Sequence, residues 1–413
     1  MKATMTIEAS QWKKALAMLS PIVNAKMALP ILADVVMKYD AQRDIFTLTC
    51  SDSETWITID CADKEGQPWI CMIEDDLNDR FQEVAIQFAP LKEAVSLLPS
   101  AQLLEVNFKD SVMKVNYGIG EFEMNCESAD TFPKPQPVAR KGEDGALCRF
   151  TLNADVLLPM MSAAIDSSAD DELRMVLNGV CLDVYNDKVV VVSTNGHELF
   201  KDIIDTGVGS GWLEYSSFPA FDKQTQQPGS AKLLITKKTR KALASAISEG
   251  PLTVTADRQR CEFCAAGVRI VARMIEGNYP NYDAVIPKDS QYRVMVSRDA
   301  LRIALRRLRL FADESVQLAE IRRDENEFII KSASAEYSRS GSEHIAIVES
   351  DTFLPSDFSI GFKISTAISI LDRISSENVV LILSEASKPV LYKQDDVRSS
   401  RLILQMPMLI NHE

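Results

Sequence analysis

The chain repeats one short pattern of elements six times, and this repetition limits the possible folds more than any single motif does. Each copy reads as a strand, a short helix and three further strands. The copies occupy residues 5–63, 84–127, 148–205, 231–276, 291–348 and 357–408. β-branched runs bounded by turn residues allow such a division by chance, which is the alternative interpretation. The same order with one helix in every copy favours a true repeat.

The length of the chain indicates several domains, because 413 residues exceed what one hydrophobic core usually organises. Pairing the copies predicts an α+β protein of three similar domains, each a pair of βαβββ repeats, at residues 1–139, 146–288 and 291–413. The joints fall in polar or proline-containing stretches. We expect residues 207–230 and the acidic insert at 63–83 to form surface loops.

The sequence predicts a soluble, cytoplasmic protein without a cofactor. Its amino terminus lacks the apolar run of a signal peptide, and no apolar stretch reaches the length of a membrane-spanning helix. Most of the eight cysteines lie in strand-like apolar runs, where cysteine acts as a small hydrophobic residue. Cys261 and Cys264 have no second pair at a suitable distance, and in a strand they point to opposite faces. We therefore predict no metal site.

The net charge of the chain and the positions of its charged residues point to different binding partners. The net charge of −14 argues against nucleic acid, yet residues 236–248 and 297–309 hold nine basic side chains where an even spread would place about three. On the second helix Leu301, Ala304, Leu305 and Leu308 share one face, beside a stripe of arginines. We also predict Lys13 and Lys14 on a first helix capped by Ser10, and Arg373 on the sixth helix.

These basic helices favour non-specific association with duplex DNA, because lysine and arginine on helix faces contact phosphates without reading bases. Equivalent helices of a repeat share a location in the fold, so the positive charge is expected on one surface. A solvated helix face is the alternative. The predicted DNA-facing residues on these helices are Lys13, Lys14, Lys237, Lys238, Arg240, Lys241, Arg298, Arg302, Arg306 and Arg309.

The sequence offers little for catalysis. Of the three histidines, His197 follows a predicted tight turn at residues 195–196, four residues after Ser193. An enzyme interpretation makes Ser193 a nucleophile and His197 its base, but no nucleophile elbow, P-loop or dinucleotide-binding motif supports it. We predict no catalytic residues and keep a hydrolase as the minor alternative.

Six short motifs resemble the bacterial DNA polymerase III beta subunit, the replicative sliding clamp. They are LPIL (29–32), LNG (177–179), TNGH (194–197), YPNYDAVIPK (279–288), IGF (360–362) and MPM (406–408). They occur in the family's order and span almost the whole chain. The resemblance implies three domains of paired repeats in the DNA clamp fold. It also implies a head-to-tail homodimeric ring with helices inside and sheets outside.

The resemblance implies a groove that captures short peptides of polymerases, the clamp loader and repair proteins. Its apolar walls, adaptable methionines and few polar groups suit peptide binding. Without the resemblance, each apolar member reads as ordinary core. The groove residues implied are Leu177, Thr194, Gly196, His197, Leu199, Pro280, Val285, Pro389, Leu404, Met406, Pro407 and Met408.

The chain departs from the family at several positions of these sites. Glu198 and Leu409 stand where clamps tend to carry arginine, and Ala284 replaces a third basic residue, which implies a less basic groove. The chain also continues through residues 410–413. Lys26 and Arg174 match DNA-contacting loops, although the two residues after Arg174 stand where tyrosines are known.

For ring closure, the resemblance implies that Phe122 and Met124 of one protomer meet Leu310 and Phe311 of the next, with domain-core packing as the alternative. The function implied is a processivity factor that encircles double-stranded DNA and tethers the replicative polymerase. It is a non-catalytic subunit of a DNA-directed DNA polymerase, whose nucleotidyltransferase activity belongs to another subunit. A DNA-binding scaffold that does not close is the other alternative.

Overall fold

The computed structural model describes residues 2–23, 29–40, 43, 45–62, 83–109, 111–207, 211–219, 228–288, 292–334, 337–350, 354–355 and 358–410. The chain divides into two compact units. Unit 1 comprises Met1–Pro159 and Gly207–Glu276, and unit 2 comprises Met160–Thr206 and Gly277–Glu413. The central domain expected from the sequence, residues 146–288, is divided between these two units, and the boundaries of the three domains stay a prediction.

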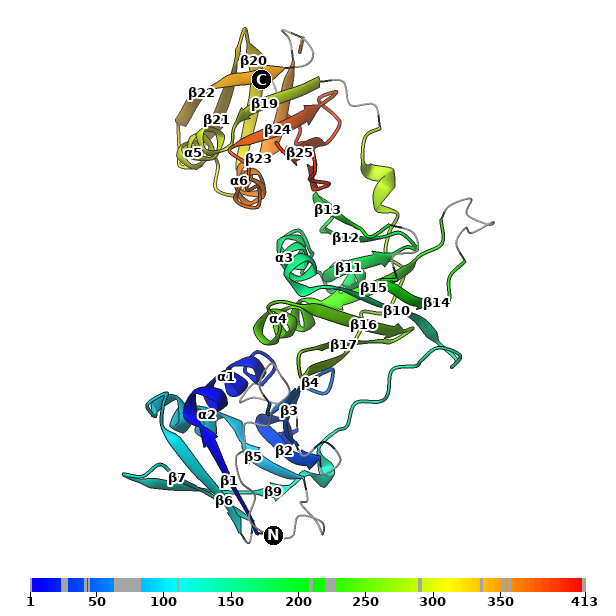
Figure 1. Ribbon diagram of the computed structural model, residues 1–413. Coiled ribbons are helices and arrows are strands. Elements are labelled where there is room, and N and C mark those ends of the chain that lie inside the picture. Colours follow the sequence, from blue (N-terminus) through cyan, green and yellow to red (C-terminus); the bar gives the residue numbers. More distant parts are fainter. Residues whose placement is uncertain are drawn as a thin grey trace. The chain divides into compact units, whose positions relative to one another are not determined.

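The predicted order of elements is confirmed in all six copies (Figure 1). The first two copies are β1 (Lys2–Glu8), α1 (Ala9–Leu19), β2 (Asp34–Asp40), β3 (Ile45–Ser51) and β4 (Thr55–Asp60), then β5 (Val84–Gln87), α2 (Phe88–Leu97), β6 (Leu103–Lys109), β7 (Val112–Asn116) and β8 (Glu121–Asn125). The next two are β10 (Ala146–Asn153), α3 (Ala154–Ile165), β11 (Gly179–Val184), β12 (Lys188–Thr194) and β13 (Glu198–Asp205), then β15 (Ala231–Thr236), α4 (Lys237–Ala246), β16 (Pro251–Asp257), β17 (Arg260–Ala265) and β18 (Val268–Arg273).

The last two copies have the same composition. They are β19 (Tyr292–Ser297), α5 (Arg298–Leu308), β20 (Leu318–Asp324), β21 (Glu327–Ser334) and β22 (Arg339–Ser350), then β23 (Ser359–Lys363), α6 (Ile364–Asp372), β24 (Asn378–Leu383), β25 (Val390–Gln394) and β26 (Leu402–Gln405). Short extra elements lie between copies, namely β9 (Glu127–Ser128), η2 (Ala129–Thr131), β14 (Leu213–Ser216) and η4 (Tyr282–Val285). Two more, η1 (Pro30–Ala33) and η3 (Met175–Leu177), lie between the helix and the second strand of copies one and three.

Neighbouring copies exchange strands. In unit 1 the first strand of copy one pairs with β6 of copy two, and the first strand of copy two pairs with β2 of copy one. In unit 2, β19 pairs with β24 and β23 pairs with β20 in the same reciprocal way. All of these pairs are antiparallel. Each such pair of copies therefore forms one interlocked body, as expected for repeats that cannot bury their apolar faces alone.

The last strands of the copies make a second kind of contact. In unit 1, β4 of copy one pairs with β18 of copy four, from Val268 opposite Ile59 to Ala272 opposite Thr55. In unit 2, β13 of copy three pairs with β26 of copy six, from Glu198 opposite Gln405 to Lys201 opposite Leu402. These two joints make the sheets continuous from one pair of copies to the next.

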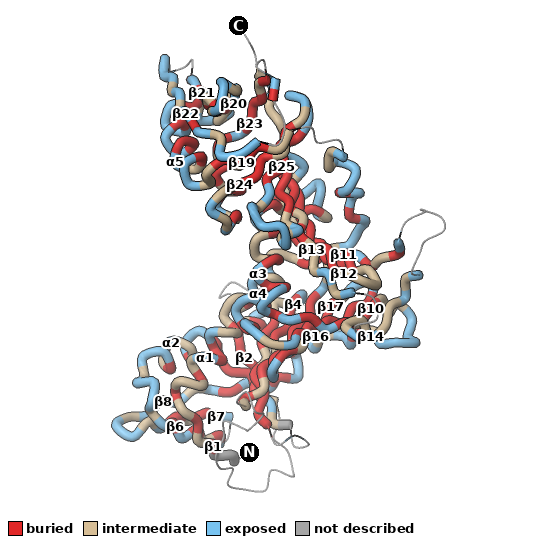
Figure 2. Tube along the Cα trace, turned by 45° about the horizontal axis from the view of Figure 1, so that its top comes forward, coloured by how far each residue is buried: buried red, intermediate tan, exposed pale blue. Residues whose placement is uncertain are grey.

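The core of each unit lies between its sheets and helices, and Figure 2 shows the buried residues concentrated along the strands. In unit 1, α1 packs against α2 and α4 and buries Trp12, Leu16 and Leu19. In unit 2, α5 packs against α6. No helix in the described ranges is long and apolar enough to cross a membrane.

Three local expectations are wrong. The first helix begins after Glu8, whose backbone N–H donates to Gln11 Oε1 at 3.3 Å, so Ser10 lies inside the helix and does not cap it. Residues 207–230 contain β14, which pairs with β10, and are therefore more than a loop. An interior proline is expected to end or kink a helix, but α3 continues past Pro159 to Ile165.

Candidate functional site

The basic residues of unit 1 lie on two neighbouring helices. Thr236 caps α4 by accepting a hydrogen bond from Thr239 N–H at 3.0 Å, and Thr239, Ala242 and Leu243 are buried. This orientation leaves Lys238 and Lys241 exposed and Lys237 and Arg240 half-buried. On α1, Lys14 is exposed, while Lys13 is half-buried and its ammonium donates to the carbonyl of Leu98. Lys238 pairs with Asp52.

The basic stripe of α5 has the predicted arrangement, because Leu301, Ala304, Leu305 and Leu308 are buried beneath it. Part of its charge is neutralised by α6. Asp372 accepts from Arg302 at 3.0 Å and from Arg306 at 3.4 Å.

The ends of this stripe differ in their partners. Arg298 donates to the carbonyl oxygen of Ile374 at 2.7 Å. Arg307, beside the stripe, forms two hydrogen bonds to Glu343. Arg309 at the end of the helix is exposed and has no carboxylate partner among the described residues.

The other residues predicted to face DNA differ in their exposure and in their partners. Lys26 lies outside the described residues. Arg174 is exposed just before η3 and pairs with Asp171 at 2.8 Å. The expectation that α6 contributes Arg373 to the basic surface is wrong, because only 7% of its side chain is exposed and it pairs with the buried Glu198.

Several of the predicted groove residues lie at the joint between β13 and β26 in unit 2. Leu199 lies opposite Leu404 in this pair. Beyond the strand end, the backbone N–H of Met406 donates to the carbonyl oxygen of His197 at 2.8 Å. The N–H of Met408 donates to Gly361 at the same distance. Two segments more than 200 residues apart in the sequence are thus held side by side by backbone hydrogen bonds.

A short helix supplies a third side of this region. In η4, the hydroxyl of the buried Tyr282 donates to Asp183 Oδ2 at 2.8 Å, and Asp283 pairs with Lys201 of β13 at 2.5 Å. Burial, and then the charge of Asp183, raise the pKa of Tyr282 far above its ordinary value, so its hydroxyl stays a donor. These contacts hold the exposed side chain of Val285 at the surface.

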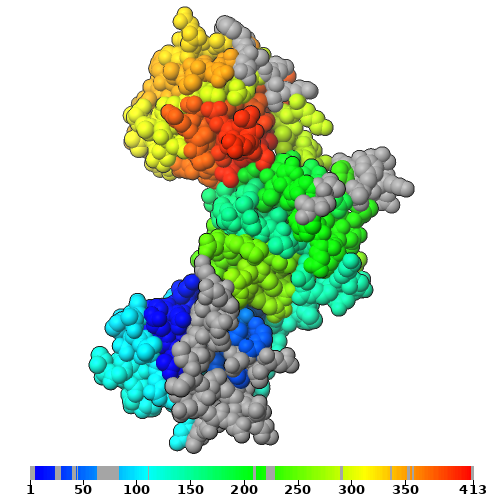
Figure 3. Space-filling model, viewed as in Figure 1, coloured from blue at the N-terminus to red at the C-terminus, as the bar shows by residue number. Residues whose placement is uncertain are grey.

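A cavity of about 550 Å³ opens between η4 and the loop before β25. Val285, Pro389 and Met406 of the predicted groove line it. Gly196, His197 and Pro280 are exposed, Pro407 and Met408 are half-buried, and Leu177, Thr194, Leu199 and Leu404 are buried. In Figure 3 the carboxyl-terminal part of the chain forms a continuous red area on the surface of unit 2. The assignment of all twelve residues to one peptide groove stays a prediction.

The sequence interpretation missed several cavity residues. Lys288, Lys388 and the loop at residues 384–387 line the first cavity or its neighbour of about 610 Å³, which Met408, Leu409 and Ile410 also line. Two exposed lysines therefore stand at the cavity although Ala284 carries no charge. Lys288 ends the YPNYDAVIPK motif, whereas the position of Lys388 depends on the fold of the loop before β25, which no local motif indicates.

Glu198 does not present its carboxylate to the groove. It is only 4% exposed, and its side chain accepts hydrogen bonds from Arg373 and from Ser167 Oγ. The resemblance implies that Glu198 replaces an arginine of the family. In this chain the replacing carboxylate forms a buried ion pair with Arg373. The reason is the alternation of strand side chains, which turns Glu198 away from the face of His197 and Leu199.

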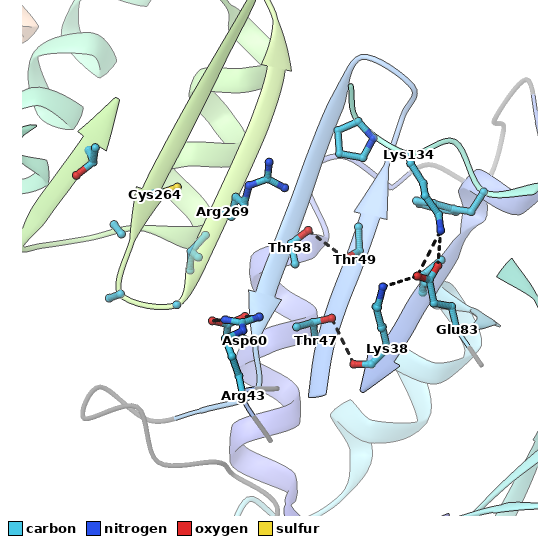
Figure 4. A pocket seen from close by; sticks show the side chains of 18 of the residues that line it. Lys38, Arg43, Thr47, Thr49, Thr58, Asp60, Glu83, Lys134, Cys264 and Arg269 are labelled. Carbon is cyan, nitrogen blue, oxygen red and sulfur yellow. Dashed lines mark hydrogen bonds and ion pairs between the residues drawn. The ribbon is translucent and has the colours of Figure 1, made fainter. Parts of the chain in front are cut away.

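The largest cavity described in unit 1, about 760 Å³, contains none of the predicted site residues. It crosses the joint of β4 and β18, and Thr49 and Thr58 meet on its floor at 3.0 Å (Figure 4). Lys38 and Lys134 both contact Glu83, at 2.7 and 3.3 Å. Burial alone would raise the pKa of Glu83, but these two lysines lower it below 4.5. The positive charge of the two lysines is therefore offset within the cavity wall.

The predicted interface residues lie on the last strand of one sheet and just after a helix. Phe122 and Met124 are half-buried on β8, which pairs only with β7 among the described strands of its sheet. Leu310 is 69% exposed and Phe311 is 40% exposed, just after α5. Core packing, the alternative explanation for all four residues, does not account for Leu310 and Phe311, because both are exposed.

The pair proposed for hydrolysis does not form. Ser193 is fully buried in β12, and its hydroxyl donates to the carbonyl oxygen of Gly179 at 3.1 Å. His197 is exposed beyond the turn. In the β12–β13 pairing Ser193 lies opposite Phe200, which turns it to the opposite face from His197.

Comparison with known proteins agrees with this geometry. Residues 283–408 match the family model of the DNA polymerase III beta subunit, C-terminal domain. The beta sliding clamp of Pseudomonas putida is 21% identical over 98% of this chain and 99% of its own length, and that of Escherichia coli is 22% identical over 75% and 77%.

Solved structures show the same fold. The sliding clamp of Bacillus subtilis superposes with a TM-score of 0.82 at 19% identity, covering 100% of both chains. The beta subunit of Thermotoga maritima gives 0.80 at 20% identity, covering 99% of this chain and 100% of its own. The chain therefore has the DNA clamp fold, and it is similar to bacterial DNA polymerase III beta subunits along nearly its whole length.

Proposed function

We propose that this chain is a sliding clamp, a processivity factor that encircles duplex DNA as a head-to-tail homodimer and tethers the replicative polymerase. The observation that carries the proposal is the way in which the last strands of the six copies pair with one another. Those of copies one and four join each other, as do those of copies three and six. The last strands of copies two and five, β8 and β22, remain.

Both remaining strands have an open edge in the described part of the chain. β8 pairs only with β7. β22 pairs with β21 along residues 339–346 and reaches β19 only with residues 347–350. An open edge carries unpaired backbone donors and acceptors that favour pairing with another strand. Pairing β8 of one protomer with β22 of the next would repeat the two joints already present and close a ring.

The sites expected from the sequence fit this function. Exposed basic residues on α1, α4 and α5 supply phosphate contacts without base recognition. The joint of β13 and β26, with the cavity beside it, supplies a surface for peptides of the polymerase, the clamp loader and other replication proteins. The clamp adds no catalytic group, because the polymerase subunit performs the chemistry. We place this activity in the cytoplasm, with the DNA.

The test is retention on nicked circular DNA after loading, in salt high enough to remove simple phosphate binding. A ring stays on the circle and leaves when a nuclease linearises it, because its retention is topological. Loss from both forms, with a loader proven active on another clamp, would favour the open scaffold. Loading should proceed normally in Ser193→Ala, whose hydroxyl has only a structural partner.

A further inference from the structure

The floor of the proposed peptide groove rests on a buried ion pair. β13 has two different faces, because successive side chains alternate along a strand. His197, Leu199 and Lys201 lie on the face of η4, where Lys201 contacts Asp283. Glu198 and Asp202 lie on the other face, and each forms an ion pair with an arginine.

Arg373 makes the central contacts of this network. It follows the last turn of α6, and its Nη1 donates to Ser167 Oγ at 2.6 Å and to the carbonyl oxygen of Ala163 at 3.3 Å. Its Nη2 donates to Glu198, and Ser167 Oγ donates to the same carboxylate at 2.5 Å. The Glu198 and Arg373 side chains are only 5% and 7% exposed. One guanidinium thus connects α3, α6 and β13.

A second pair continues the network along the same joint. Arg401, just before β26, bonds to Asp202 of β13 at 2.9 Å and to the carbonyl oxygen of Arg373 at 3.1 Å. Beyond the end of β13, the β13–β26 pairing continues into the hydrogen bond from Met406 N–H to the carbonyl oxygen of His197. The Asp202–Arg401 pair thus joins the two strands directly, and the Glu198–Arg373 pair joins β13 to α6 and, through the carbonyl of Arg373, to Arg401.

We propose that Glu198 and Arg373 are positioning residues for the peptide groove: their buried pair keeps β13 and β26 in register and so determines the spacing of His197 and Met406. This inference rests on the function proposed above for the groove. Loss of one partner leaves a buried charge without its counter-charge, which is far more disruptive than loss of both. The joint is then expected to open at the strand end.

The experiment compares Glu198→Gln with Glu327→Gln in the full-length protein. The control removes the carboxylate from the more exposed pair with His344, in the same unit. Hydrogen exchange is followed in fragments covering residues 402–408 and, as an internal reference, in β24. The binding of the replicative polymerase's catalytic subunit is measured in parallel.

We expect Glu198→Gln to speed exchange about tenfold in residues 402–408 with β24 unchanged, and to weaken polymerase binding about tenfold. The control should change neither. The double variant Glu198→Gln and Arg373→Gln should return both within about threefold of the parent. Parent-like exchange in Glu198→Gln, or equal acceleration in β24, would overturn the inference. A parent protein that binds no polymerase would instead contradict the proposed function, and the exchange result would still decide this one.

Discussion

Asp34, the first residue of β2, is a carboxyl group held inside unit 1 and only 7% exposed. Burial, and to a lesser extent the charge of Glu127, raise its pKa from 3.8 to about 6. Between these values the folded protein binds more protons than the unfolded chain. Stability therefore falls as the pH rises from about 4 to about 6, and stays lowered above it.

Asp34→Asn removes this penalty. We expect the variant to gain up to about 3 kcal/mol of unfolding free energy at pH 8 and little at pH 4, measured by urea denaturation at both values. Asp130→Asn, at an exposed position, is the comparison. An equal gain at the two pH values would show that ionisation of Asp34 is not the cause.

Gly361 leaves no room for a side chain. A Cβ there would lie 2.6 Å from the carbonyl oxygen of Met408 and 2.8 Å from Cγ1 of Ile410. We expect Gly361→Ala to displace the terminal segment, lowering the unfolding free energy by roughly 1–3 kcal/mol and polymerase affinity about tenfold. Ile360→Val in the same strand should lose about 1 kcal/mol without this binding defect. Equal affinities in calorimetry would argue against the displacement.

At the scale of single residues, the sequence predicts local features better than contacts between distant residues. The stripe of α5 follows from side chains three and four positions apart, so its buried and exposed faces were predictable. The partner of Glu198 lies 175 residues away. No periodicity connects Glu198 to Arg373, and each alone reads as an exposed charge. The buried pair could only be seen in the folded chain.

Among the elements, α5 and α6 together set the charge of the basic stripe that we propose to face DNA. Asp372 holds two arginines of the α5 stripe, and removing its charge frees them for phosphate contacts. We expect Asp372→Asn to bind a labelled linear duplex severalfold more tightly, with a steeper dependence on salt, in anisotropy titrations. Glu377→Gln changes the net charge equally just after α6. The same gain in both variants would mean that only total charge matters.

The element that departs from expectation is α3. An interior proline removes one backbone donor and is costly in a helix. Yet Leu157, Met161 and Ala164 of α3 are fully buried on both sides of Pro159. Burial of this face outweighs one missing hydrogen bond, so the helix continues. Local propensity predicts the existence of this helix better than its end.

At the scale of the whole molecule, the sixfold repeat was readable because strand and helix periods alternate six times along the chain. The pairings between the last strands of different copies could not be read from the sequence, because they join strands that are hundreds of residues apart. β14 was missed for a similar reason: its four residues gain their strand conformation by pairing with β10.

The ring makes a prediction for an exposed residue. Leu310→Glu places a charge on an apolar side chain that is 69% exposed, so the fold should tolerate it while the contact with the next protomer does not. We expect sedimentation to show monomers at micromolar concentration where the parent is a dimer. Val397→Glu, at a fully exposed apolar position of unit 2, should remain dimeric. A dimeric Leu310→Glu would place the interface elsewhere.

The open edges of β8 and β22 have a consequence for assembly. When two different edges pair with each other, the pairing itself does not limit the number of protomers. Every added protomer leaves one free edge at each end of the assembly. Only the angle between successive protomers decides whether the second addition meets the first or starts a filament. A substitution that alters this angle by a few degrees, far from either edge, would turn a closed particle into a polymer whose length grows with concentration.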